Sequence, residues 1–153
     1  MKQASPSRRA AISQSLALAA AGVACASGAA GAAENPASPS TYRVVFQVSD
    51  ADPAKWGLTL NNIRNAQHEL GAGHTKIELV VFGPGIGMLM AASETAGRVS
   101  EAAKAGVVVS ACENTMRGQK LSREQMNPDA GYVPSGVAHL IRRQAEGYAY
   151  IRS

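Results

Sequence analysis

Cys112 is the residue of this 153-residue chain whose type and position point most directly to chemistry. It follows the apolar run at residues 107–111 (VVVSA) and precedes residues 113–117 (ENTMR), which we interpret as the first turn of a helix. A thiol at such a junction faces unpaired backbone N–H groups and the positive end of the helix dipole. Both favour the thiolate, the reactive form of cysteine. Cys112 is therefore a candidate nucleophile, and the alternative is a small buried side chain that only fills space.

Three residues that follow Cys112 are candidates to support an anion on its sulfur. Asn114 and Thr115 can donate hydrogen bonds at the start of the helix, although they are also ordinary residues for that position. Arg117 lies about one helical turn along and either stabilises a thiolate by its charge or lies in solvent. The sequence leaves both readings open for each of the three.

Gly83, Pro84 and Gly85 follow another apolar run, at residues 77–82. A glycine-rich turn after a strand can hold phosphate. Here, however, the spacing is G-x-G-x-G rather than the G-x-G-x-x-G of dinucleotide sites, and no Walker lysine follows. We therefore interpret the segment as tight packing, a turn, or a wall of the pocket around the thiol, and we expect no cofactor.

The charge and the histidines argue against two further classes of site. Three of the fifteen basic residues and none of the eleven acidic ones precede residue 34, so twelve bases face eleven acids after it, a net charge of +1. Aromatic residues are few and no basic run exceeds Arg142 and Arg143, so nucleic-acid binding has little support. The three histidines are scattered, with no i, i+4 pair and no cysteine nearby, so the sequence predicts no metal site.

Residues 1–33 have the layout of a secretory signal peptide. Basic residues at the start precede a nearly uncharged, alanine-rich stretch that ends in the A-x-A pattern of residues 30–32. The stretch is too interrupted for a transmembrane helix, so no membrane span is expected. Residues 34–41 then form a linker. We expect a periplasmic or secreted protein after cleavage.

Two features leave the export route open. Arg8 and Arg9 also resemble a twin-arginine signal, so both export routes remain possible. Cys25 offers a lipoprotein alternative, but Gly22 stands where a lipobox usually has leucine, which weakens it. Cleavage before Glu34 leaves Cys112 as the one cysteine, and it then has no partner for an internal disulfide.

Strands and helices are expected to alternate through residues 42–153. Apolar, β-branched runs predict strands at 42–48, 77–82, 107–111 and 148–151, and helices are expected at 53–70, 88–92, 99–105 and 135–144, with a helical turn at 122–126. This order predicts an α/β protein, a three-layer α/β/α sandwich with a mostly parallel sheet of about four to five strands. Ligands of such sheets bind beyond the carboxyl ends of the strands. The loops 49–53 and 83–87 and the segment from Cys112 should therefore share one edge.

Two segments together resemble a known family. A strand ending in Gly83-Pro84-Gly85 and a later strand ending in Ala-Cys-Glu-Asn-Thr-Met-Arg-Gly (residues 111–118) look like the DsrE/DsrF-like family, the YchN-type proteins of sulfur metabolism, over about residues 42–153. The resemblance implies a small α/β/α fold that assembles into homotrimers or homohexamers. In relay members such as DsrE and TusD a cysteine carries sulfur as a persulfide. Cys112 matches that cysteine, and Arg117 with Gly118 matches an arginine–glycine step after it. The best-known relay members are cytoplasmic, whereas this chain begins with an export signal.

Two function hypotheses follow. In the first, the protein is an exported sulfur carrier that uses Cys112 and exchanges sulfur with a donor or acceptor protein or a small sulfane-sulfur compound. The absence of a second mature cysteine favours a carrier over a self-contained enzyme. In the second, the protein is a non-catalytic oligomer that binds a small ligand or acts as a scaffold, and the cysteine is structural. A domain this short has a limited core, so burial of Trp56, Met88, Leu89 or residues 148–151 against other copies would help to stabilise it.

Overall fold

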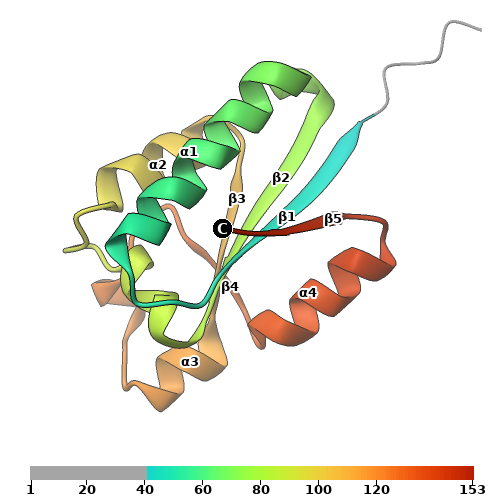
Figure 1. The fold of residues 1–153 in the computed structure, drawn as a ribbon. Helices are drawn as coiled ribbons and strands as arrows, with labels where there is room; N and C mark the ends of the chain where they lie inside the picture. The colour runs from blue at the N-terminus through green and yellow to red at the C-terminus, as the bar shows by residue number, and fades with distance from the viewer. Residues whose placement is uncertain (1–40) are drawn as a thin grey trace, which may run out of the picture. The chain divides into compact units, whose positions relative to one another are not determined.

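Five parallel strands form the central sheet in the computed structural model, which describes residues 41–153 (Figure 1). The strands lie in the order β4-β3-β2-β1-β5, and every neighbouring pair is parallel. Their bounds are β1 Tyr42–Val48, β2 Thr75–Val81, β3 Val108–Cys112, β4 Gly131–Val133 and β5 Ala149–Arg152. Four of the five correspond to the strands expected from the apolar runs, so the α/β class and the strand number are confirmed.

Capping residues set the starts of the two longest helices. The Asp52 side chain accepts a hydrogen bond from the Ala54 amide at 2.9 Å, and Pro53 opens the helix. Ser135 accepts one from the Ala138 amide at 3.4 Å. The α-helices are α1 Pro53–Leu70, α2 Ala96–Lys104, α3 Glu113–Gly118 and α4 Gly136–Ala145. Short 3₁₀ segments are η1 Ala72–His74, η2 Gly83–Leu89 and η3 Arg123–Gln125.

The two faces of the sheet are covered unequally. Helices α1 and α2 pack on one face, over the larger core, which includes Phe46, Leu79 and Ile63 (Figure 1). The other face contacts α4, and its buried core there is small: Val45, Val80 and Leu140, with Phe82 and Tyr148 partly buried beside them. Side chains alternate along each strand, so the α4 face also carries Glu78, Ser110 and Cys112. The position of Cys112 therefore depends on how α4 sits.

Two expectations about local structure differ from what is observed. The helix expected at residues 88–92 is replaced by the 3₁₀ segment η2, which ends at Leu89. Strand β4 was not foreseen, because it is three residues long and follows a turn-forming segment. Trp56, Met88 and Leu89, which were among the alternatives for contacts between copies, are buried in the core of the chain itself.

Residues 1–40 lie outside the described part of the chain, and with them the expected signal peptide, nearly all of the linker, and Cys25. Within residues 41–153, no helix combines the length and the apolar composition needed to cross a bilayer.

Candidate functional site

Cys112 is the last residue of β3 and the N-cap residue of α3. Its side chain is on the face of the sheet that α4 covers, and only 4% of the residue is exposed. The backbone N–H of Gly136, the first residue of α4, donates a hydrogen bond to the sulfur at 3.2 Å. This bond gives a partner to one of the amides at the start of α4 that have no acceptor within the helix.

The loops beyond β1 and β2 meet α3 at the carboxyl edge of the sheet, as expected. The Gly83 amide donates to the Thr115 hydroxyl oxygen at 2.9 Å, which joins the glycine-rich loop to α3. The Gln119 side-chain amide donates to the Gly83 carbonyl at 3.1 Å. The Gly85 amide donates to the carbonyl of Ser49, after β1, also at 3.1 Å. Three segments distant in sequence therefore frame the strand end that carries Cys112.

Gly83 and Gly85 are required by this packing. Gly83 has φ +57°, in the left-handed region that favours glycine. A β-carbon at Gly85 would lie 2.9 Å from the Val48 carbonyl oxygen, so the backbone of η2 could not approach the end of β1. Pro84 between them is exposed. These contacts account for the Gly-Pro-Gly sequence as a tight, packed turn beside α3.

The surroundings of Cys112 favour its anion. Burial raises the pKa of the thiol, but the Thr115 hydroxyl and the backbone amides of Gly136, Thr115 and Asn114 lower it by more. The net effect is a thiol pKa below the ordinary value for cysteine. A larger fraction of the sulfur is therefore thiolate near neutral pH than in an unfolded chain.

Asn114 and Arg117 are paired with each other on the exposed side of α3. The Arg117 guanidinium donates to the Asn114 side-chain oxygen, and both residues are exposed. The backbone N–H of Asn114 donates a hydrogen bond to the Pro134 carbonyl at 3.2 Å, which connects α3 to the segment that leads into α4. Thr115 and Gly83 are thus brought beside the strand end, whereas the hydrogen bond of the Arg117 side chain goes to Asn114.

A buried charged cluster on the α4 face was missed by the sequence reasoning. The Glu78 side chain, 4% exposed, accepts hydrogen bonds from the Ser110 hydroxyl at 2.6 Å and from Arg143 Nε at 2.6 Å, and its Oε1 lies 2.7 Å from His139 Nε2. Burial raises the pKa of Glu78, but the bonds from Ser110, Arg143 and His139 lower it by more, so the net shift is downward. A glutamate within the apolar run 77–82 was the available signal, because a buried carboxylate needs partners.

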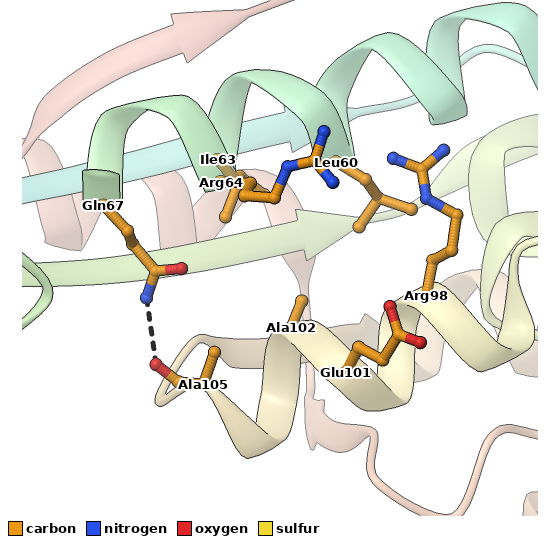
Figure 2. A pocket seen from close by; sticks show the side chains of 8 residues that line it. All are labelled: Leu60, Ile63, Arg64, Gln67, Arg98, Glu101, Ala102 and Ala105. Carbon is orange, nitrogen blue, oxygen red and sulfur yellow. Dashed lines mark hydrogen bonds between the residues drawn. The ribbon is translucent and has the colours of Figure 1, made fainter. Parts of the chain in front are cut away.

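Two hollows of the surface are not lined by the thiol. One of about 190 Å³ lies between α1 and α2, and Figure 2 shows its lining side chains, with the bond of 2.9 Å from the Gln67 amide to the Ala105 carbonyl at one end. Another of about 220 Å³ lies beside α3 and includes Glu113 and Arg117. Neither is lined by Cys112. Across residues 41–153, no three His, Cys, Asp or Glu side chains gather as a metal site would require.

Two comparisons with known proteins give matches. The family model of the DsrE/DsrF-like family matches residues 42–152. Among solved structures, the chain is similar to the protein of unknown function MTH1491 from Methanobacterium thermoautotrophicum, with 38% identity and a TM-score of 0.70. That match covers 73% of this chain and 99% of the other. No curated protein matches the chain.

Proposed function

Because this chain belongs to the DsrE/DsrF-like family, we propose that it is a sulfur-relay protein that carries sulfur as a persulfide on Cys112. The family supports the sulfur-relay class, and one observation carries the finer proposal. The Cys112 sulfur lies at the end of an inner strand and accepts the Gly136 amide at 3.2 Å. Such a site holds a negative charge on sulfur, which both the attacking thiolate and the persulfide product need.

The proposed transfer is a displacement at sulfur. The Cys112 thiolate attacks the outer sulfur of a sulfane donor such as a polysulfide, an organic persulfide or thiosulfate. A new S–S bond forms on Cys112 while the donor's own S–S bond breaks, and its electron pair leaves on the shortened polysulfide, the thiolate or sulfite. An acceptor thiolate later attacks the outer sulfur of the Cys112 persulfide and restores the Cys112 thiolate. No external oxidant is needed, since the sulfur moves at a constant oxidation level.

The residues around the sulfur have roles in this proposal. The Thr115 hydroxyl and the amides at the start of α3 and α4 stabilise the anion. Gly83, Pro84 and Gly85 shape the wall on which α3 rests, through the Gly83–Thr115 hydrogen bond. Arg117, which is paired with Asn114 on the exposed side of α3, offers a surface cation for an anionic donor. The sulfur must then leave to another molecule, a protein or a small compound.

A structural cysteine is the second candidate, and the burial of the sulfur favours it. Cys112 is 4% exposed and lines neither of the two hollows described above. Such burial is typical of a cysteine that only fills space in a core. In that case the protein is a binding or scaffold module. Thiol reactivity separates the two candidates.

The test is sulfur uptake by the folded protein. The chain from residue 34 onward is incubated with polysulfide or thiosulfate and its intact mass is measured, with a Cys112→Ser variant as control. The carrier proposal predicts a gain of one sulfur atom on the wild type and none on the variant. Resistance of the folded thiol to both sulfur uptake and alkylation at pH 7, while the unfolded chain reacts, would overturn the carrier proposal and favour a structural cysteine.

We also propose that the carrier is a homotrimer or homohexamer. Exposed apolar side chains support this: Val137 and Ile141 lie one turn apart on α4, and Tyr150 and Ile151 lie on the edge strand β5. Light scattering of the purified protein measures the subunit number, and a monomer at all concentrations would contradict the proposal.

Export is the remaining proposal. The pattern of residues 1–33 supports a signal peptide, cleaved to give a periplasmic or secreted protein. The intact mass of protein purified from the cell envelope and the medium gives the cleavage point and any lipid on Cys25. An uncleaved chain confined to the cytoplasm would contradict the proposal.

A further inference from the structure

Helix α4 is held on the sheet by few apolar contacts. Of its ten residues, Gly136 and Leu140 are buried, whereas Val137 and Ile141 are 54% and 62% exposed. The buried cluster beneath the helix is correspondingly small. A helix with so little buried apolar surface needs other contacts to fix its position.

Glu78 supplies those contacts. Its carboxylate in β2 meets two α4 side chains one turn apart, with Oε1 at 2.7 Å from His139 Nε2 and Oε2 at 2.6 Å from Arg143 Nε. The Ser110 hydroxyl of β3 holds Oε1 from the sheet side at 2.6 Å. Two attachment points one turn apart fix both the rotation and the position of the helix along its axis.

The start of the same helix contacts the sulfur. Gly136 precedes His139 by three residues, so both lie on the side of α4 that faces the sheet. Its amide donates to the Cys112 sulfur at 3.2 Å, a contact that a shift of the helix by an ångström would weaken. The contacts of Glu78 and the contact at the thiol therefore depend on the placement of the same helix.

We propose that Glu78 is a positioning residue for the sulfur chemistry of Cys112, because its buried carboxylate seats α4 so that the first amide of the helix stays on the sulfur. The inference rests on the proposed carrier function of Cys112. Glu78 does not touch the sulfur in this arrangement, and it acts through His139, Arg143 and the backbone of α4.

The direction in which Glu78→Gln changes the thiol pKa of Cys112 separates this positioning role from a simple charge effect. Glu78→Gln removes a negative charge on the same face as the thiol, which by Coulomb interaction alone would lower the thiol pKa. If α4 shifts because its contacts with Glu78 are lost, the Gly136 hydrogen bond to the sulfur weakens and the thiol pKa rises. If a substitution only makes the thiol more accessible, the alkylation rate at high pH, where all of the thiol is ionised, exceeds that of the wild type, and the midpoint of the profile does not move. The midpoint of the pH–rate profile reports the charge environment, and its plateau reports access.

The experiment is the pH dependence of Cys112 alkylation by iodoacetamide in the folded protein, with circular dichroism to verify folding. Glu78→Gln should raise the midpoint by roughly 0.5–1 pH unit, and Arg143→Gln, which leaves Glu78 in place, should raise it in the same direction. Sulfur uptake from polysulfide below the midpoint should fall by about three- to tenfold. Glu146→Gln, which removes the other carboxylate bound to Arg143, should leave the midpoint unchanged.

The outcomes are distinct. An unchanged or lowered midpoint in folded Glu78→Gln overturns the inference, and if that variant does not fold, an unchanged or lowered midpoint in Arg143→Gln overturns it. A midpoint that rises equally in Glu146→Gln overturns it as well, because the effect would then be general to α4. If the wild type takes up no sulfur, the carrier function fails instead, while the comparison of midpoints still tests the link between Glu78 and the thiol.

Discussion

The amide of Gly136 lies 3.2 Å from the sulfur of Cys112, although the two residues are 24 positions apart and belong to different elements. This contact joins the end of β3 to the start of α4. It also requires glycine, because a β-carbon at position 136 would lie 2.8 Å from Cδ1 of the Phe82 ring. The sulfur, the helix start and the ring therefore form one packed unit.

Gly136→Ala should weaken this unit. The added methyl group pushes the start of α4 away from Phe82, which costs about 1–3 kcal/mol of unfolding free energy, and it lengthens the bond to sulfur, which raises the thiol pKa. Urea unfolding and the pH profile of alkylation measure the two effects. Gly97→Ala in α2 is the matched control, because a β-carbon there meets no atom within 4 Å and it should keep or slightly increase stability. Equal effects from both substitutions would contradict the packing argument.

Thr115→Val should raise the thiol pKa without a large change in shape. The hydroxyl lowers the pKa of Cys112, and its oxygen also accepts the Gly83 amide at 2.9 Å. Its loss removes both, so the alkylation midpoint should rise by roughly 0.5 unit and stability should fall by about 1 kcal/mol. Arg117→Gln serves as the comparison: a similar rise there would show that the cation acts on the sulfur through space, whereas an unchanged midpoint would confine its role to the surface.

Glu78→Gln should cost about 3 kcal/mol at neutral pH, because Arg143 and His139 lose the carboxylate charge they face in a buried site and the amide keeps only one of the two acceptor oxygens. The pKa of Glu78 is lowered in the folded protein from an ordinary value of about 4.5. Its contribution to stability is therefore complete above that value and is lost as the pH falls through the lower, folded-state value. The difference in unfolding free energy between wild type and variant should narrow between about pH 5 and pH 2. If the difference in unfolding free energy stays constant over this range, the charge of the Glu78 carboxylate is not what stabilises the folded protein.

Ile141→Glu should shift the protein toward monomers if α4 lies between copies. Ile141 is 62% exposed, so its replacement costs a lone chain little. Leu58→Glu, at a 48% exposed position of α1, is the matched control and should not change the subunit number. Light scattering of both variants distinguishes the faces, and an unaltered assembly in Ile141→Glu would remove α4 from the interface.

Local patterns predicted most of the fold, and contacts between distant residues account for what was missed. Apolar runs and the caps Asp52 and Ser135 identify the longer elements because they depend on neighbours in sequence. Strand β4 exists because it pairs with β3, and three residues after a turn carry no such information. The thiol was foreseen for the same local reason as the helices. Its contact with Gly136 depends on where α4 packs, and so do the two α4 partners of Glu78, which lie 61 and 65 positions away.

The order of strands has a consequence for biosynthesis. β1, which opens the described chain, pairs with β5, whose last residue is Arg152. The sheet therefore cannot be completed before β5 has been synthesised, and the edge of β1 stays open until β5 pairs with it. A chain that lacks β5 would expose the unpaired edge of β1 to other copies.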